Sequence, residues 1–319
     1  MSAEAPLPEG VTPLRELGVG GQARVRLVRR ELASGDKELQ VLKLPKGNEP
    51  ALQARLQQEF AMLERLAEPG HEHVIQTRGP CRLPGGAVAG FFLEYVDGGS
   101  LAQIVAASLP ETAPASSPAA PQAQPMSFAD RLLCCAQAAE GLAYVHEQKI
   151  VHRDVKPSNI LVDRTGEQPR AVLSDFGVAR DPEVTLNTNC KVGTDAYAAP
   201  DLVPGKEQPH HDVFALGATL WFVFTGQHLL DHPETRERLF TNHHLPDLPR
   251  GTDSKQNACR EVLDETIHKT CHPDARKRWT AQKVAQVLHK LHSDHFAPKP
   301  MPSDKTVRSL SSRLSVAIV

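Results

Sequence analysis

Residues able to carry out chemistry gather at positions 150–177, which read IVHRDVKPSNILVDRTGEQPRAVLSDFG. One cluster contains Asp154, Lys156 and Asn159, and a second contains Asp175. Oxygen atoms of Asp and Asn bind hard divalent cations, which also bind phosphate oxygens. A lysine can neutralise a transferring phosphoryl group, and a further carboxylate can accept the proton of an attacking hydroxyl. These residue types favour phosphoryl transfer from a metal-bound donor.

A short hairpin is expected to bring the two clusters together. Apolar residues at 160–162 and 171–173 flank a polar segment that contains Gly166 and Pro169. Two short apolar runs separated by turn residues are typical of a β-hairpin. Such a hairpin would place the residues before its first strand beside those after its second strand.

The ordered residues H-R-D-V-K-P-S-N at 152–159 and D-F-G at 175–177 resemble the signature of protein kinases. The resemblance covers roughly residues 11–293. It implies a two-lobed α+β fold, with a small N-lobe of antiparallel sheet and one main helix, and a larger, mostly helical C-lobe.

The resemblance also implies a role for each polar residue. Asp154 would be the catalytic base, and Lys156 would neutralise the phosphoryl group. Asn159 and Asp175 would hold Mg²⁺, with Mn²⁺ as an alternative. Thr194 is assigned to the site because its family counterpart bonds the base and the lysine. A lysine two residues after the base resembles serine/threonine kinases rather than tyrosine kinases.

The segment L-G-V-G-G-Q-A-R-V at 17–25 resembles the glycine-rich loop that covers ATP in kinases, with Ala23 in place of the third glycine. A plain glycine hairpin is the alternative interpretation. By resemblance, the nucleotide contacts are assigned to Leu17, Gly18, Val19, Gly20, Gly21, Val25, Val41, Glu94, Val96 and Leu161.

Lys43 ends the triplet V-L-K, which resembles the kinase motif V-A-I-K. In the family this lysine contacts the donor phosphates and a glutamate on the next helix. Glu59 is the expected partner because it precedes Leu63 by four residues, as in the pattern E-x-x-x-L-x-x-L. Glu64 and Glu49 are the structural alternatives.

The predicted domain plan has three parts. A flexible N-terminal arm covers residues 1–10, the kinase domain covers 11–293, and a tail covers 294–319. Within the domain we expect an N-lobe at about 11–95, a hinge at 94–99, a C-lobe at 100–293 and a disordered insertion at 109–126, which contains five prolines. Helices are predicted at 51–66, 100–107, 127–148, 212–224, 233–240, 257–270 and 280–292.

Residues 177–199 resemble an activation segment. Thr185 or Thr188 is the predicted phosphosite, because a phosphate there could engage Arg153 beside the base. The following A-P-D ends in Asp201, for which Arg276 and Arg278 are both possible partners, with Arg278 favoured. Asp212 is expected either to favour a helix N-terminus by its charge or, by resemblance, to hold the catalytic-loop backbone.

The overall composition excludes some classes of protein. The 319 residues carry a formal net charge of −2, which gives no reason to expect nucleic acid or an anionic membrane as partner. The longest apolar stretch, 213–224, is too short to cross a bilayer. The six cysteines form no spaced framework, so we expect reduced thiols and a cytoplasmic location.

The sequence therefore predicts transfer of the ATP γ-phosphate to serine or threonine hydroxyls of proteins. The expected partners are ATP and protein substrates, with transient self-association for autophosphorylation. A pseudokinase scaffold and a small-molecule kinase of the same fold are the alternatives.

Overall fold

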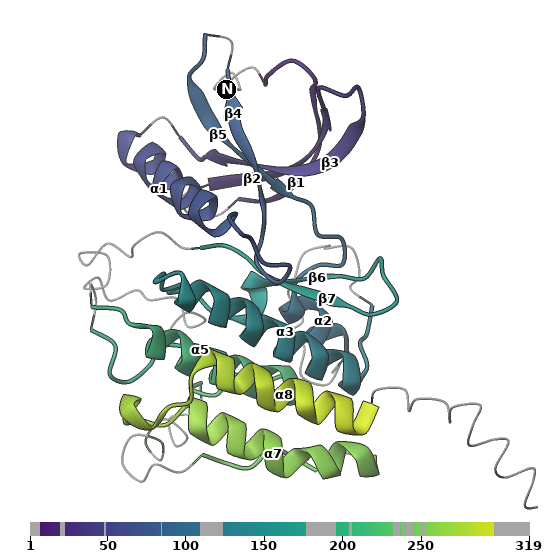
Figure 1. Ribbon diagram of the computed structural model, residues 1–319, viewed down its shortest axis with the longest axis vertical. Helices are drawn as coiled ribbons and strands as arrows, with labels where there is room; N and C mark the ends of the chain where they lie inside the picture. The colour runs from purple at the N-terminus through teal and green to yellow at the C-terminus, as the bar shows by residue number, and fades with distance from the viewer. Residues whose placement is uncertain are drawn as a thin grey trace, which may run out of the picture.

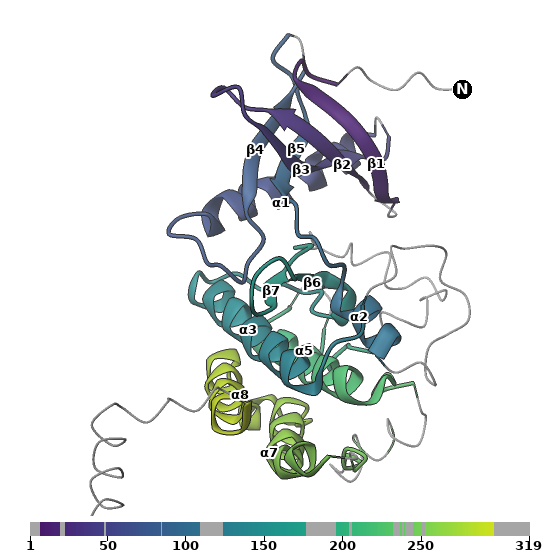
Figure 2. The same ribbon diagram turned by 90° about the vertical axis from the view of Figure 1, so that its right-hand side faces the viewer.

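The computed structural model describes residues 7–19, 23–47, 49–83, 85–108, 124–176, 196–203, 206–231, 237, 239, 245–250 and 253–296. They form two lobes joined after strand β5, a small one built on a sheet and a larger helical one (Figures 1 and 2). This is the α+β arrangement predicted from the sequence. None of the helices among these residues is long and apolar enough to span a membrane.

The small lobe contains a five-stranded antiparallel sheet in the order β1-β2-β3-β5-β4. The strands are β1 (Val11–Val19), β2 (Ala23–Glu31), β3 (Lys37–Pro45), β4 (Thr77–Arg82) and β5 (Val88–Glu94). The register places Val25 of β2 opposite both Gly18 and Lys43. The glycine-rich end of β1 and the lysine of β3 are therefore neighbours on either side of β2.

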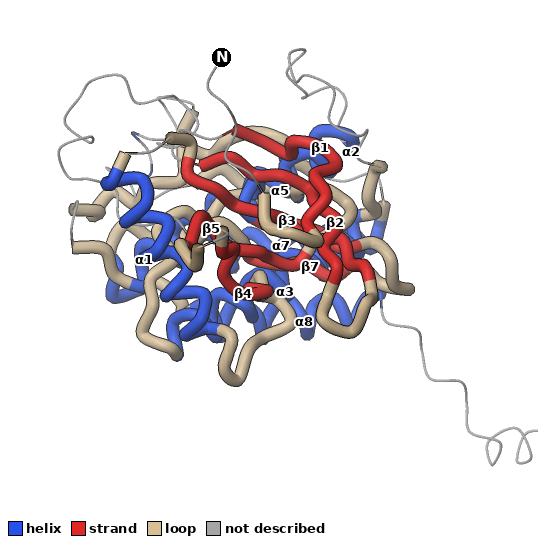
Figure 3. Tube along the Cα trace, turned by 90° about the horizontal axis from the view of Figure 1, so that it is seen from above, coloured by secondary structure: helices blue, strands red, loops and turns tan. Residues whose placement is uncertain are grey.

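Helix α1 (Pro50–Leu66) packs along one side of this sheet, near β3, β4 and β5 (Figure 3). It begins with Pro50, whose missing N–H costs nothing in the first turn. Its buried residues are Leu56, Glu59, Leu63 and Leu66, which recur at helical spacing. A glutamate thus lies on the stripe that faces the sheet.

The other face of the sheet carries its own small apolar cluster, made of Val28, Leu42, Cys81 and Phe92. Leu7 packs against this cluster, and the Val11 N–H donates to the Pro8 carbonyl at 3.3 Å. Residues 7–10, predicted as part of a flexible arm, are therefore in contact with the sheet. The Pro-rich composition of this segment did not indicate that it packs apolar surface against the sheet.

The large lobe is built from α2 (Leu101–Ser108), α3 (Phe128–Glu147), α5 (Pro209–Thr225), α7 (Ser254–Thr270) and α8 (Ala281–Phe296). The short helices η2 (Pro157–Asn159) and η3 (Ala275–Lys277) complete it. The Ser127 hydroxyl accepts from the Asp130 N–H and caps α3. α5 is buried along most of its length, as predicted for residues 213–224.

The predicted hairpin is present as β6 (Ile160–Asp163) and β7 (Arg170–Leu173), and it lies between α3 and the small lobe (Figure 1). Ile160 pairs with Leu173, so the start of β6 lies beside the end of β7. The residues that flank the hairpin are thereby brought together at its open end.

The predicted insertion and three helix boundaries need correction. Residues 109–123 and most of the helix predicted at 233–240 lie outside the described residues. Residues 124–126, predicted to be disordered, are not: Met126 is buried and its N–H donates to the Ser108 hydroxyl at 2.9 Å. α5 begins three residues before the predicted 212, and α7 begins three residues before the predicted 257. α8 continues to Phe296, into the predicted tail.

Candidate active site

The open end of the β6–β7 hairpin sets the distance between the two polar clusters. The Asn159 carbonyl accepts hydrogen bonds from the Ser174 N–H at 2.8 Å and from the Ser174 hydroxyl at 2.9 Å. Asp175 is the next residue along the chain. The hairpin therefore fixes Asp175 beside the loop that ends in Asn159.

Within that loop, the Asp154 carboxylate is held by its neighbours. Its Oδ2 accepts from Lys156 Nζ at 2.7 Å and from Asn159 Nδ2 at 2.9 Å. The same Asn159 nitrogen donates to the Asp154 carbonyl at 2.8 Å. Since the Asn159 amide nitrogen is engaged in this way, its amide oxygen remains as a potential metal ligand.

Asp212, in the first turn of α5, holds the backbone of the same loop. Its carboxylate accepts from the N–H of His152 at 2.7 Å and from the N–H of Arg153 at 2.8 Å, and lies 3.0 Å from His146 Nε2. Arg153 has φ 71°, which is unusual for a residue other than glycine. Hydrogen bonds to the Asp212 carboxylate thus hold the loop backbone, as the resemblance implied.

His152 links the two clusters, a role that the sequence analysis did not assign. Its Nε2 donates to the Ser174 carbonyl at 3.1 Å, and its Nδ1 accepts from the Asp154 N–H at 3.3 Å. Its ring lies 4.5 Å from the ring of buried Phe176. Burial lowers the pKa of His152 despite the nearby charges of Asp212, Asp154 and Asp175. The H-R-D motif contained the signal, but only the fold shows its partners.

Lys43 reaches across from the small lobe. Its Nζ lies 2.6 Å from Glu59 and 2.8 Å from Asp175. The predicted pair with Glu59 is present, rather than one with Glu64 or Glu49. Burial alone would lower the pKa of Lys43, but the charges of Glu59 and Asp175 outweigh it and leave the pKa raised. The ammonium is held in its charged form between two acids.

Asp175 has φ 55° and points its carboxylate at Lys43. Burial would raise the pKa of Asp175, but the Lys43 charge and hydrogen bond outweigh it, so the pKa lies below its usual value. A carboxylate that stays ionised is the form that ligates a divalent cation.

The residues assigned to the nucleotide lie on both sides of the junction between the lobes. Val25 and Val41 lie on neighbouring strands of the small lobe, and Val96 is buried just after β5. Leu161 of β6 forms an isolated bridge with Ser100. Leu17, Gly18 and Val19 end β1, whereas Gly20 and Gly21 lie outside the described residues.

Glu94 has polar partners that the sequence did not reveal. Its N–H donates to the Gln76 carbonyl at 2.9 Å, and its carboxylate accepts from the Gln76 N–H and from Arg170. Among the described residues, the Val96 N–H donates to no backbone carbonyl. This part of the hinge therefore retains backbone hydrogen-bonding capacity at Val96.

A pocket adjoins Asp154 on the side of the A-P-D turn. Its lining includes Asp154, Tyr197, Ala199, Leu202, Glu207 and Ala215. Tyr197 is buried and its hydroxyl lies 2.9 Å from His228 Nδ1. Sequence reasoning missed Tyr197, Leu202 and Glu207 because only the fold shows that they face the same space as Asp154.

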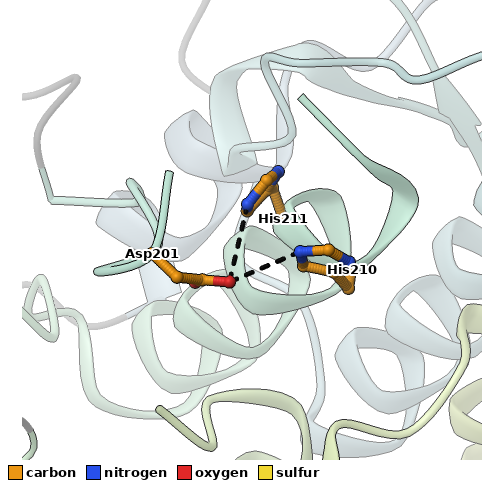
Figure 4. Close-up of side chains that lie close together, drawn as sticks. All are labelled: Asp201, His210 and His211. Carbon is orange, nitrogen blue, oxygen red and sulfur yellow. Dashed lines mark ion pairs between the residues drawn. The ribbon is translucent and has the colours of Figure 1, made fainter. Parts of the chain in front are cut away.

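Asp201 of the A-P-D turn pairs with Arg278, at 2.5 Å, whereas Arg276 pairs with Asp274. His210 and His211 also approach its Oδ2, at 3.4 and 3.5 Å (Figure 4). Burial would raise the pKa of Asp201, but Arg278 outweighs it and leaves the pKa lowered. Asp201 therefore pairs with the favoured one of its two expected partners.

The Asp201 cluster has the shape of a metal site, since its three ligand atoms lie within 4.8 Å of one another. The hydrogen bonds argue against that function. His211 Nδ1 accepts from the Gln208 N–H at 2.8 Å, so the proton of the neutral ring is on Nε2, the atom that faces Asp201. A protonated Nε2 donates a hydrogen bond and cannot ligate a metal. The cluster instead ties the turn to the start of α5.

Like Gly20 and Gly21, the predicted residues Thr185, Thr188 and Thr194 lie outside the described residues.

The two lobes and the paired acidic clusters agree with the fold that the resemblance implied. A family model described as the protein kinase domain matches residues 11–290. The chain therefore belongs to the protein kinase family.

Similar proteins include two serine/threonine-protein kinases of Mycobacterium tuberculosis (strain ATCC 25618 / H37Rv). PknF is 30% identical over 235 residues, which are 72% of this chain and 46% of PknF. PknB is 26% identical over 306 residues, which are 93% of this chain and 45% of PknB. PknB of Mycobacterium leprae (strain TN) is 27% identical over 284 residues, 87% of this chain and 42% of that protein. The chain thus spans less than half the length of these relatives.

Proposed function

We propose that this protein transfers the γ-phosphate of ATP to serine or threonine hydroxyls of protein substrates. The observation that carries the proposal is the geometry of Asp154, whose carboxylate borders a pocket and is fixed by Lys156 and Asn159. The names of the similar mycobacterial kinases support the choice of hydroxyl substrate.

Each residue has a role in this proposal. Asp154 accepts or orients the proton of the substrate hydroxyl, which is worth roughly 10²–10⁴ in rate. Lys156 balances charge on the transferring group, and Lys43 contacts the donor phosphates. Thr194 remains a predicted partner of the base.

The donor set fits a hard divalent cation, because it offers the ionised Asp175 carboxylate and the Asn159 amide oxygen. Mg²⁺, or Mn²⁺ in its place, would be held by Asn159 and Asp175. When bound, the cation would neutralise charge on the phosphates. The adenine would lie between Val25, Val41 and Leu161, with Glu94 and Val96 supplying backbone groups.

The test is incorporation of radiolabelled phosphate from ATP into a generic protein substrate by wild type and Asp154→Asn. We expect the variant to lose about 100-fold or more of the rate, since the base is removed while the shape is kept. Asp247→Asn, at an exposed pair with Arg260, is the matched control and should retain full activity.

Two outcomes would contradict the proposal. Equal incorporation by wild type and Asp154→Asn would remove Asp154 as the base. Nucleotide binding without any transfer would favour the scaffold alternative, and consumption of ATP only with a metabolite would favour a small-molecule kinase.

We further propose autophosphorylation at Thr185 or Thr188 through transient self-association. Arg153, beside the proposed base, supports this. Its ion pair with Glu207 is long, at 4.0 Å, and its side chain is 37% exposed, so a phosphate could reach the guanidinium. Full activity of the double alanine variant, with no phosphate found by mass spectrometry, would reject the idea. The five described cysteines are free and buried, which supports the proposed cytoplasmic location.

A further inference from the structure

A second group of imidazoles lies away from the active site, where the loop after α1 meets α3 and α8. Three histidines surround the Glu140 carboxylate of α3. His289 Nε2 of α8 is 2.9 Å from Oε2, and His73 Nε2 and His71 Nε2 are each 3.9 Å from a carboxylate oxygen. The tautomer test that argued against metal binding at Asp201 can be applied to each ring.

His73 passes that test. Its Nδ1 lies 2.9 Å from the Ala171 carbonyl, which can only accept, so Nδ1 carries the proton and Nε2 keeps its lone pair. Metal-binding histidines commonly donate their other ring N–H to a backbone carbonyl in this way. The ring is also buried and its backbone is fixed, because the His73 carbonyl accepts from the Leu173 N–H at 2.9 Å.

The three other groups differ in what they can contribute. His71 Nδ1 accepts from the His73 N–H at 3.2 Å, so its Nε2 is protonated and serves as a donor. His289 Nε2 donates to Glu140 Oε2 at 2.9 Å, but its Nδ1 has no hydrogen bond to any described residue, so the proton can move to Nδ1 when a cation takes the Nε2 lone pair. Glu140 supplies a carboxylate, a usual ligand for borderline divalent cations.

We propose that His73 Nε2, His289 Nε2 and the Glu140 carboxylate bind a divalent cation of the Zn²⁺ class, with water in the remaining position. Two imidazoles and one carboxylate are a known ligand set for Zn²⁺. The site is separate from the one assigned to Mg²⁺ and does not depend on phosphoryl transfer.

Binding needs the ligand side chains to move closer together. With metal–ligand distances of about 2.0–2.2 Å, tetrahedral ligand atoms lie about 3.3–3.6 Å apart. Among the described residues, only the Asp201 group already has all its ligand atoms within 4.8 Å of one another. The Glu140 and His289 side chains are 45% and 39% exposed, so they are free to close on the fixed His73 ring. The bound ion would join the loop after α1 to α3 and α8.

The experiment uses the full chain, freed of metal by a chelator, without nucleotide or Mg²⁺. Titration calorimetry with Zn²⁺ should show about one ion per chain with a Kd of about 1 µM or lower, and Zn²⁺ at 100 times Kd should raise Tm by roughly 5 °C. His289→Ala and Glu140→Gln should each weaken binding at least ~10-fold, because each removes a ligand. Bound Co²⁺ should give absorption bands in the visible range, and His289→Ala and Glu140→Gln should each lose them.

Two matched controls are available. His295→Ala, on the same helix, and His210→Ala, at the Asp201 group, should leave the Kd unchanged. An unchanged Kd in both His289→Ala and Glu140→Gln would mean an adventitious ion only and would overturn the proposal. Loss of binding in His210→Ala alone would place the ion at Asp201 and would equally overturn it.

Discussion

At the scale of single residues, the Lys43 ammonium lies between two carboxylates, 2.6 Å from Glu59 and 2.8 Å from Asp175. Lys43→Met keeps most of the apolar stem but removes the charge. We expect kcat/KM to fall about 100-fold, comparable to the loss of one preorganised electrostatic contact. Burial raises the pKa of Glu59, which allows this carboxyl to take up a proton and limits the damage to the fold.

The matched control for that variant is Lys37→Met on the same strand. The Lys37 side chain is 62% exposed and its ion pair with Glu31 spans 3.9 Å, so its loss should be nearly neutral. Steady-state kinetics with varied ATP, together with circular dichroism, is the measurement. A Lys43→Met enzyme with wild-type kcat/KM would remove Lys43 from the site.

The residue pairs of the site were predictable to different degrees. The Lys43–Glu59 pair was implied by the resemblance to kinases, in whose pattern E-x-x-x-L-x-x-L the glutamate precedes a leucine by four residues, as Glu59 precedes Leu63. The contact of Lys43 with Asp175 did not, because it joins residues 132 positions apart. The same holds for His152, whose tautomer is set by the Ser174 carbonyl and the Asp154 N–H. Motif spacing identifies residue types, whereas such long-range contacts depend on how the lobes pack.

At the scale of elements, the first turn of α5 supports the catalytic loop through Asp212. Asp212→Asn keeps the size but loses the charge and one of the two acceptors for the His152 and Arg153 N–H groups. Leaving a buried donor unpaired costs about 1–3 kcal/mol. We therefore expect lower stability in urea unfolding, with kcat reduced more than the KM for ATP.

Asp294→Asn is the control for that change. Asp294 forms an exposed i,i+4 pair with Lys290 on α8, and such pairs contribute about 0.3–0.5 kcal/mol. Equal unfolding midpoints for Asp212→Asn and wild type would show that the loop does not need this carboxylate.

The middle of α5 gives a second prediction at this scale. A Cβ at Gly217 would overlap the Thr270 hydroxyl and the Cys271 sulfur, both in buried residues at the end of α7. Gly217→Ala gains about 1 kcal/mol in helix propensity. Overpacking of a rigid core costs about 1–3 kcal/mol, so the net effect should be destabilising.

Guanidinium unfolding should show a lower midpoint for Gly217→Ala. Gly47→Ala is the control, because a Cβ at Gly47 would meet nothing within 4 Å. A more stable Gly217→Ala protein would mean that α5 and α7 can separate at this contact.

Apolar periodicity predicted most elements, since α3 and α5 bury continuous stripes. It predicted the segments beside them less well. Met126 is buried although it follows a Pro-rich run, and Leu7 covers the outer face of the sheet. Single apolar residues in polar surroundings carry no period, so their burial depends on a neighbouring surface that the local sequence does not encode.

At the scale of the whole molecule, buried histidines make stability depend on pH. Burial lowers the pKa of His73, His152, His211 and His292. An unfolded histidine has a pKa of about 6.5, so the unfolded state binds more protons just below that pH. Stability should be complete above about pH 6.5 and decrease as the pH falls toward the lowered values. Each histidine contributes up to about 1.4 kcal/mol per pH unit.

The acids Asp175 and Asp201 add a second loss at lower pH. Because their pKa values are lowered in the fold, their contribution is present above the usual value of about 3.9 and is lost below it. Urea unfolding at a series of pH values should therefore show two separate declines.

His152→Phe tests the first decline and connects it to the active site. Phenylalanine retains the packing on Phe176 but has no proton to gain. The free energy of unfolding should therefore fall less steeply between pH 6.5 and 5, by the contribution of one histidine. In wild type, a proton on His152 Nδ1 would remove the acceptor of the Asp154 N–H. Because the folded ring takes up this proton only near its lowered pKa, activity lost in this way should fall at a lower pH than the one at which stability begins to decline. Parallel stability curves for wild type and variant would show that His152 does not titrate on unfolding. Activity that is lost already where stability begins to decline, near pH 6.5, would show that protonation of folded His152 is not the cause.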